Sequence, residues 1–385
     1  MENYKPASCM KKVNEPAFVV VFPSIFARKK IVLLLSNIKK ILKIQNLQFE
    51  NIFVDDDVIV IKANDPVFVS HEINRLFGIE YVSIARRTEN KFNDVVSTIT
   101  KIGSNILLVG ELFYIKVDGF ALGFLPKDIE IAATGTLVEK VADIDCKPGT
   151  ESKYDKMIHC HLTKNNAYVS IFLEKGHGGI PYDSQGEEIL CCIFDEFSAI
   201  SCLETIKQGF QTRVAVCYSS ESNLMELVKI INRILPRLLS SEVILDFYHI
   251  PIKHDNTKST QQKIFVVSRV LVDLAKKYKI HKVSLALSPL VFPMWLIEEH
   301  SHIVTKEKLL PWIPLAGIDN SIFETAREIG LAKYLHKIEK YGQYKFTQGK
   351  EDLSKLVKKT ISTRKTLKLK IGPNNIHDIL NSINH

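Results

Sequence analysis

The sequence has no long apolar run. Its longest apolar stretch, residues 283–297, is interrupted by Pro289 and Pro293 and is shorter than the roughly 20 residues that a transmembrane helix needs. Residues 1–19 contain no sustained apolar region either, so the sequence predicts no secretory signal peptide. We therefore expect neither a membrane span nor a membrane partner.

The cysteines follow no framework spacing. An odd number of scattered cysteines argues against a disulfide scaffold and indicates buried free thiols in a reducing compartment, so we expect a cytoplasmic protein. Side chains of adjacent strand residues point to opposite faces, so Cys191 and Cys192 are expected to be separate parts of the core. The cysteines are Cys9, Cys146, Cys160, Cys191, Cys192, Cys202 and Cys217.

Metal-ligand spacing is also missing. His159 and His161 would share one face of a strand, while Cys160 between them would point away. This is not the ligand pattern of a zinc site, even with Cys146 nearby. We predict no metal site.

Basic residues, in contrast, are in excess and clustered. The net charge is +8, which favours a polyanionic partner such as nucleic acid. Lysine and arginine neutralise phosphates, so several such clusters in one chain favour RNA binding. The clusters are Arg28–Lys30, Lys39 and Lys40 with Lys43, Arg86 with Arg87, and a C-terminal run from Lys350 to Lys370.

The order of predicted elements divides the chain into parts. Strands at 18–22, 53–54, 58–61 and 81–85, with helices at 27–42 and 69–77, follow the β-α-β-β-α-β order of a ferredoxin-like unit, and residues 86–90 read as a polar joint. A helix at 92–102, a strand at 113–117 and a hairpin of 157–162 with 167–173 come next; residues 119–127 read as a glycine- and proline-punctuated connection, and 136–141 are too short to assign. Strands at 188–192, 213–217, 241–248 and 282–287 then alternate with helices at 199–208, 223–235 and 262–278, as in a parallel sheet, and a helix at 319–329 follows.

The turn after the strand at 188–192 lacks what a phosphate-binding loop requires. Folds of this kind place glycines there, so that backbone N–H groups can approach phosphate oxygens. Residues 193–198 contain no glycine and no lysine, and Asp195 and Glu196 would repel an anion. We interpret the turn as structural. The glycine-rich segment 176–186 could contact RNA or a nucleotide, but we favour a joint in which the chain changes direction.

Two segments resemble one known family. Ala167–Val169, followed by Gly176–Pro181 and Gly186, resembles the junction of the tRNA 4-thiouridine synthetases, also called thiamine-biosynthesis sulfurtransferases. Pro314–Asp319, continued by Glu324–Gly330, is similar to a second family segment. The resemblance spans about residues 18–335. It implies a multidomain α/β protein, with a ferredoxin-like domain (1–88), a THUMP domain (89–178), a parallel-sheet, Rossmann-like PP-loop domain (179–337) and a basic C-terminal tail (338–385).

The departures from the family are as informative as the matches. Of the family's PP-loop, only Ser198 remains in the aligned turn. A second nucleotide segment falls on residues 285–293, where bulky apolar residues and prolines replace small polar ones. Residues 333–345 contain no sulfur-carrying cysteine, and Asp118 stands where the family's THUMP domain has a basic residue.

These observations predict a protein that binds tRNA or another structured RNA in support of tRNA modification, without ATP-dependent adenylation. No catalytic residue and no cofactor are then expected; the RNA-binding candidates that the resemblance implies are Arg28, Lys29, Lys30, Arg86 and Arg87. A first alternative is an active tRNA sulfurtransferase that uses ATP and Mg²⁺ with a non-standard loop containing Ser198. A second is a scaffold in thiamine or sulfur metabolism. A homodimer and a catalytic partner protein both stay open.

Overall fold

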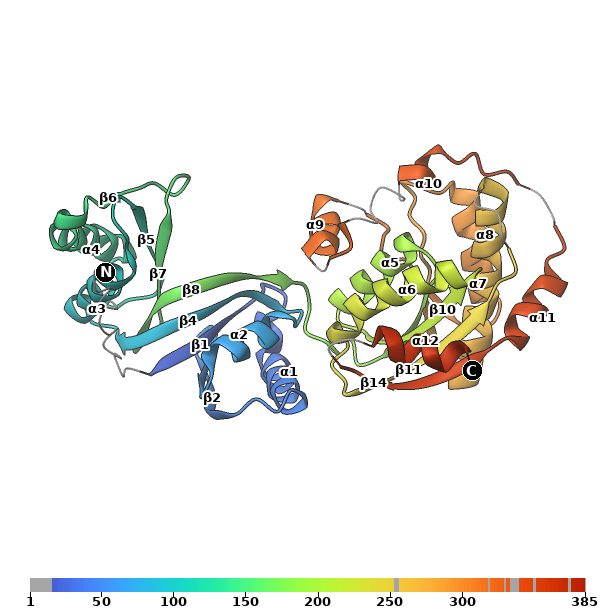
Figure 1. The fold of residues 1–385 in the computed structure, drawn as a ribbon, viewed down its shortest axis with the longest axis horizontal. Helices are drawn as coiled ribbons and strands as arrows, with labels where there is room; N and C mark the ends of the chain where they lie inside the picture. Colours follow the sequence, from blue (N-terminus) through green and yellow to red (C-terminus); the bar gives the residue numbers. More distant parts are fainter. Residues whose placement is uncertain are drawn as a thin grey trace, which may run out of the picture. The chain divides into compact units, whose positions relative to one another are not determined.

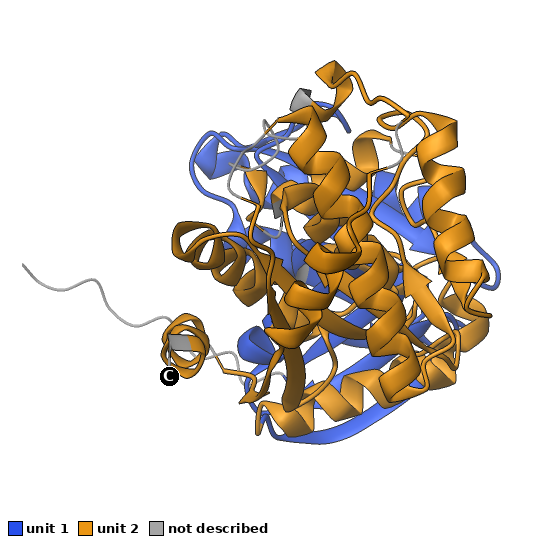
Figure 2. Cartoon of the chain, turned by 90° about the vertical axis from the view of Figure 1, so that its right-hand side faces the viewer, with its two compact units in different colours: residues 1–22, 47–71, 81–175 blue, residues 23–46, 72–80, 176–385 orange. Residues whose placement is uncertain are grey.

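The computed structural model describes residues 16–252, 256–317, 319–328, 330–332, 339–348, 351–372 and 375–384. The chain divides into two compact units (Figure 2). Unit 1 comprises residues 1–22, 47–71 and 81–175, and unit 2 comprises residues 23–46, 72–80 and 176–385. The fold is multidomain α/β, as predicted. Among the described residues, no helix has the length and apolar character needed to cross a bilayer.

An eight-stranded sheet begins with the predicted ferredoxin-like order. Its strand order is β2-β3-β1-β4-β8-β7-β5-β6, and the first four strands have the arrangement expected of a β-α-β-β-α-β unit. Strand β4 continues through Arg86 and Arg87, so the polar joint predicted at residues 86–90 is wrong for most of its length. These elements are β1 (Ala17–Pro23), η1 (Arg28–Lys30), α1 (Ile31–Ile44), β2 (Phe49–Asp55), β3 (Val58–Ala63), α2 (Pro66–Asn74) and β4 (Ile79–Glu89).

The second half of this sheet carries two helices. The sequence predicted only the first of them, α3. The second, α4, begins at Pro126 and buries Ile129, Ala133 and Leu137, which are spaced four residues apart and therefore lie on one face. The elements are α3 (Phe92–Ile106), β5 (Leu112–Gly119), α4 (Pro126–Lys140), η2 (Ala142–Ile144), β6 (Lys147–Pro148), β7 (Lys156–Leu162) and β8 (Asn166–Gly178), and β7 with β8 forms the predicted hairpin.

Unit 2 contains a six-stranded sheet in the order β13-β12-β9-β10-β11-β14. Pairing is parallel from β13 to β11, and β14 is antiparallel to β11. Helices α5, α6 and α12 cover one face, and α7, α8 and α11 cover the other (Figure 1). Strand β9 is an almost continuous buried run because both faces of a parallel sheet are covered. The elements are β9 (Glu188–Ile193), α5 (Glu196–Lys207), β10 (Gln211–Tyr218), α6 (Glu221–Ile234), η3 (Leu235–Arg237), β11 (Glu242–His249), α7 (Thr257–Tyr278), β12 (Lys282–Ser284), α8 (Met294–Thr305), β13 (Leu310–Trp312), α9 (Asn320–Glu328), α10 (Glu339–Gln343), α11 (Ser354–Ser362), β14 (Lys365–Lys370) and α12 (Ile376–Asn384).

The basic C-terminal segment is part of this folded unit. The sequence predicts only a basic tail from residue 338, but this segment contains α10, α11, β14 and α12, and β14 closes an edge of the sheet. Helix α8 was not predicted, and β12 is shorter than the predicted strand. Lys350, the first residue of the basic run, lies outside the described residues. The domain boundaries after residues 88, 178 and 337 stay predictions.

A buried carboxylate attaches β14 to the sheet. Asp246 on β11 is fully buried and accepts hydrogen bonds from the hydroxyls of Tyr278 (3.1 Å) and Thr366 (2.6 Å). Two guanidinium groups lie farther away, that of Arg213 at 3.6 Å and that of Arg364 at 3.8 Å. At these distances they balance the charge without forming normal hydrogen bonds. Because a buried charge is stable only with partners, Asp246 holds strands β10, β11 and β14 together with α7.

We predict that Asp246→Ala destabilises unit 2 by about 3–5 kcal/mol, because removal of one partner leaves the others buried and uncompensated. Both tryptophans of the chain, Trp295 and Trp312, lie in unit 2, so urea unfolding followed by tryptophan fluorescence measures its stability. Glu242→Ala is the matched control on the same strand. It removes only an exposed pair with Lys368, and we expect a change of at most about 1 kcal/mol. Equal effects of the two substitutions would contradict this account of Asp246.

Candidate functional site

The turn between β9 and α5 lies at the carboxyl end of the sheet, where α/β folds of this type bind ligands. Asp195 is the N-cap of α5, and its Oδ1 accepts a hydrogen bond from the backbone N–H of Ser198 (2.7 Å). The Ser198 hydroxyl accepts from the N–H groups of Phe194 and Asp195, both at 2.9 Å, and donates to the carbonyl of Asp195. A carboxylate of the chain itself therefore occupies the N-terminus of the helix, where an anionic ligand would bind.

Aromatic side chains cover this carboxylate. The Tyr341 hydroxyl donates a hydrogen bond to Oδ2 of Asp195. The Tyr341 ring contacts those of Phe197 and Phe292, with centroids 5.8 and 5.6 Å apart, and Phe292 also contacts Phe346 at 5.4 Å. We call Phe197, Phe292, Tyr341 and Phe346 the aromatic cluster. Phe292 belongs to residues 285–293, the segment that the resemblance aligned with a nucleotide motif, and it supplies one of the covering rings.

Little space is left at the end of β9. The cavity lined by Cys192, Phe194 and Leu287 has a volume of about 10 Å³, which is at the lower limit for a single water molecule. Side chains thus fill this part of the sheet edge. Ser198, the only predicted nucleotide-binding residue, is 1% exposed, and its backbone N–H and hydroxyl are both used within the turn.

Burial changes the ionisation of the capping carboxyl. Removal from water raises the pKa of Asp195 to about 6, although the hydrogen bonds from Tyr341 and Ser198 favour the charged form. Asp195 therefore takes up a proton at a much higher pH than an ordinary aspartate. The turn is held by a group that titrates below neutral pH.

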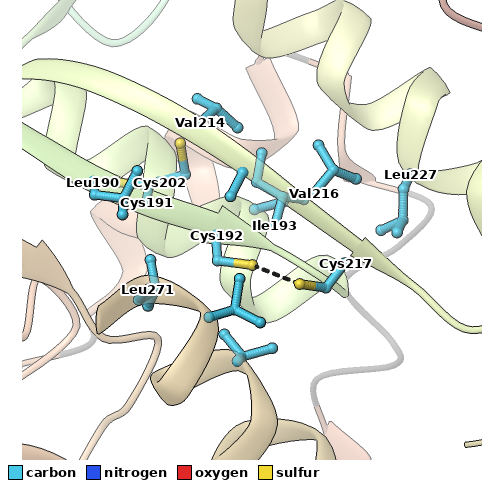
Figure 3. Close-up of a cluster of buried hydrophobic side chains, with 14 of the residues drawn as sticks. Leu190, Cys191, Cys192, Ile193, Cys202, Val214, Val216, Cys217, Leu227 and Leu271 are labelled. Atoms are coloured by element: carbon cyan, nitrogen blue, oxygen red, sulfur yellow. Dashed lines mark hydrogen bonds between the residues drawn. The ribbon is translucent and has the colours of Figure 1, made fainter. Parts of the chain in front are cut away.

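The core beneath the turn contains pairs of thiols. Cys192 on β9 and Cys217 on β10 face each other, and their sulfur atoms are 3.4 Å apart (Figure 3). Cys191 points away and hydrogen-bonds with Cys202 on α5. The six described cysteines are all free and buried, as predicted, and Cys9 lies outside the described residues.

The glycine-rich segment is a packed joint within unit 2. A Cβ on Gly176 would lie 2.3 Å from the carbonyl oxygen of Ile79. Gly179 has a φ of +76°, and a Cβ there would lie 2.8 Å from the carbonyl oxygen of Lys207. Both positions therefore require glycine. This packing supports the interpretation as a joint, because the glycines are explained by contacts of the chain with itself.

The RNA-binding candidates lie in different units. Arg28, Lys29 and Lys30 form the exposed turn η1 in unit 2, where the Lys30 ammonium donates to the carbonyl of Ser184 (2.5 Å). Arg86 and Arg87 lie in unit 1 on β4, and the exposed Arg87 guanidinium lies 5.1 Å from the centre of the Phe18 ring. Cationic groups are thus present on the surface of both units.

A charged cluster in unit 1 was not predicted from the sequence. Asp118, at the end of β5, bonds through Oδ2 to Nε2 of His159 (2.9 Å) and through Oδ1 to Nδ1 of His161 (2.5 Å). His161 bonds through Nε2 to Asp57 (2.9 Å), and the Phe22 ring packs edge-on against both imidazoles. The two histidines share a face, as predicted. Asp118 is the acidic partner of both histidines. The parallel pairing of β5 with β7 brings Asp118 opposite His161, and the sequence contains no signal for this pairing.

Hydrogen bonds outweigh burial in this cluster. Burial alone would lower the pKa of His161, but Asp118 and Asp57 raise it to about 9. Burial likewise opposes the ionisation of Asp118, yet its bonds with the histidines hold its pKa well below the usual range. The cluster is therefore an ion pair at neutral pH. Within the described part of the chain, no group of three or more histidine, cysteine or acidic side chains is arranged to hold a metal ion.

Comparison with known proteins establishes the fold. A 4-thiouridine synthetase, solved in complex with RNA and with bound ATP, superposes with a TM-score of 0.64 at 12% sequence identity, covering 92% of this chain and 100% of that one. PH1313 from Pyrococcus horikoshii Ot3 superposes with a TM-score of 0.62 at 18% identity, covering 82% of this chain and 100% of that one. No family model and no curated protein matches the sequence. The resemblance to 4-thiouridine synthetases is confirmed at the level of the fold.

The raised pKa of Asp195 predicts a pH-dependent contribution to stability. Between about pH 4 and pH 6 the folded carboxyl keeps its proton while the unfolded one has lost it, so stability falls as pH rises through this window. Relative to Asp195→Asn, which does not titrate, the wild type should lose about 3 kcal/mol of unfolding free energy between pH 4 and pH 7. Urea unfolding of both proteins at each pH measures the difference. If the difference in unfolding free energy between the wild type and Asp195→Asn stays constant with pH, or if the wild type gains stability as the pH rises, Asp195 is not buried in this way.

The ion pair in unit 1 predicts a pH dependence of the same sign at higher pH, because His161 stays protonated far above its ordinary pKa. The contribution of His161 to stability is complete below about pH 6.5, the ordinary histidine pKa, and is lost as the pH rises through about 9. Nuclear magnetic resonance titration of histidine-labelled protein should therefore show His161 titrating near pH 9. Asp57→Asn removes one of its partners and should lower this value. A wild-type His161 that titrates near pH 6.5 would contradict the observed pairing.

Proposed function

We propose that this protein binds structured RNA, with tRNA as the leading candidate, and does not activate ATP. The observation that carries the proposal is the occupied N-terminus of α5, where Asp195 takes the position open to a phosphate group. Tyr341 and the aromatic cluster close over the same place. A helix terminus that is already capped by a buried carboxyl group of the chain offers a phosphate neither donors nor a favourable potential.

The fold supports the RNA part of the proposal. The chain shares its fold, over nearly its whole length, with a 4-thiouridine synthetase whose structure holds RNA. Arg28, Lys29 and Arg87 are exposed cations in the segments that led to the prediction. We propose that the protein acts in the cytoplasm, in support of tRNA modification or as an RNA-binding carrier for a catalytic partner. A homodimer is the other form compatible with this role.

An ATP-dependent sulfurtransferase is the competing function. Two observations favour it: the 4-thiouridine synthetase that shares this fold was solved with bound ATP, and Ser198 is present, although its hydroxyl and N–H are both engaged by the turn. ATP–pyrophosphate exchange that is abolished by Ser198→Ala would establish this function instead. A scaffold in thiamine or sulfur metabolism would remain if no RNA bound at low salt.

We predict that bulk tRNA binds with an affinity that falls steeply between about 50 and 200 mM salt, because bound cations are released from phosphates. The double substitution Arg28→Gln with Lys29→Gln should weaken binding and reduce the salt slope by about 2, close to one unit for each phosphate that the variant no longer neutralises. Fluorescence anisotropy with labelled tRNA at several salt concentrations measures both quantities.

The matched control removes the same charge from another basic surface. Lys358 and Lys359 are exposed on α11, so Lys358→Gln with Lys359→Gln changes the net charge equally. We expect this control to leave the salt slope almost unchanged. Equal losses from both double substitutions would mean that binding depends on net charge alone, which would refute the assigned surface.

A further inference from the structure

Unit 2 contains a pocket that is separate from the β9–α5 turn. It has a volume of about 630 Å³ and lies between α7, α8 and the described residues Lys345, Thr347 and Glu351. Apolar walls come from Phe265 and Leu296, and His300 of α8 also lines it. This volume is within the range of pockets that hold small organic molecules.

His300 presents a hydrogen-bond acceptor to this pocket. The side chain is buried, and Nδ1 lies 2.9 Å from the hydroxyl oxygen of Ser268. That hydroxyl donates its own proton to the carbonyl of Ile264 (3.0 Å), so Nδ1 must carry the hydrogen in this contact. The lone pair is then on Nε2. Burial, and next the charge of Arg269, lower the pKa of His300 to about 4, so the ring is neutral at physiological pH.

Nε2 has no protein partner among the described residues. The hydrogen bond to Ser268 and the ring contact with Phe265 are the polar and aromatic contacts that His300 makes there. Nε2 is also not one of the fully buried atoms without a hydrogen bond, so it lies on the accessible wall of the pocket. A buried imidazole with a free lone pair at a pocket wall requires a donor from a ligand or from solvent.

The other polar groups of the pocket include both acceptors and lysine donors, and their charges balance. The side-chain amide of Gln261 donates to the carbonyl of Thr347 (3.0 Å), and that of Gln262 donates to Glu351 (2.7 Å). Each glutamine is thereby oriented and keeps its oxygen as an acceptor. Lys258 pairs with Glu351 at 3.1 Å. The lining residues Lys258, Lys345, Glu299 and Glu351 sum to zero charge, so the pocket does not favour a polyanion.

We propose that this pocket binds a nucleobase with an exocyclic amino group, which donates to Nε2 of His300 while its ring packs on Phe265. The apolar walls fit a flat ring, the acceptors fit amino and ring N–H donors, and the balanced charge fits an uncharged base. The base can come from a free nucleoside or from an unstacked nucleotide of RNA. The proposal does not depend on the basic surface discussed above, because no residue is shared between the two.

The first test compares adenosine with purine riboside, which lacks only the amino group. Isothermal titration should show that adenosine binds and that purine riboside binds about tenfold more weakly or not at all, as expected for one lost hydrogen bond to a buried acceptor. His300→Gln should weaken adenosine binding by a similar factor. The matched control is His302→Gln, which changes an exposed histidine on the same helix and should have no effect.

A second measurement covers the case in which His300→Gln fails to fold. The ¹⁵N resonance of His300 Nε2 in the wild-type protein should shift to saturation on addition of adenosine and should shift much less with purine riboside. A short oligoadenylate that binds more tightly than adenosine, and moves the same resonance, would identify RNA as the source of the base; equal affinity would identify the free nucleoside. Absence of binding by adenosine, guanosine and cytidine, or binding that leaves Nε2 unmoved, would overturn the proposal. Neither result depends on tRNA binding by η1.

Discussion

The N-terminus of α5 imposes the constraint on which the site depends. A helix begins with backbone N–H groups that have no partner within the helix, and they create a positive potential that an anion or a capping side chain must satisfy. In a phosphate-binding fold the ligand does this. Here Asp195 does it from within the chain, and Ser198 closes the hydrogen-bonding of the turn. The N–H donors of this turn are therefore satisfied by groups of the chain itself.

The packing around the turn follows from the capping of α5 by Asp195. A buried carboxylate must be stabilised, and Tyr341 supplies a donor from a segment far away in the sequence. The rings of Phe197 and Phe292 then exclude water from the same place. Unit 1 also contains a carboxylate with tertiary partners. Asp118 bonds to two histidines of β7 and supplies their counter-charge. In both units, a residue that looks anomalous in the sequence has a partner that only the tertiary structure provides.

Much of the architecture could be predicted because it follows from local patterns. The β-branched run Val58–Ile61 and the buried run of β9 indicated their strands directly. The helix predicted at 319–329 is α9, and of its two possible caps, Asp319 and Ser321, Asp319 accepts hydrogen bonds from the N–H groups of Ser321 and Ile322. Helix α4 was missed because alanine, glycine and threonine weaken its apolar periodicity. Strand β14 was not located from the sequence because its lysines interrupt the apolar pattern; it is held by Asp246, which is more than a hundred residues earlier in the chain.

The sequence shows that residues 193–198 contain no glycine and no lysine, but it does not show which groups satisfy the N–H donors of this turn. The hydrogen bond between Tyr341 and Asp195 closes the turn, and the closure of this turn can be tested directly. Titration of ¹⁵N-labelled protein with ATP and Mg²⁺, followed at the backbone N–H of Ser198, reports on the place where a phosphate would bind. We expect this resonance to stay unchanged up to millimolar ATP, because its hydrogen bond to Asp195 is already made. A saturable shift of the Ser198 resonance, with displacement of the Tyr341 ring, would contradict the account.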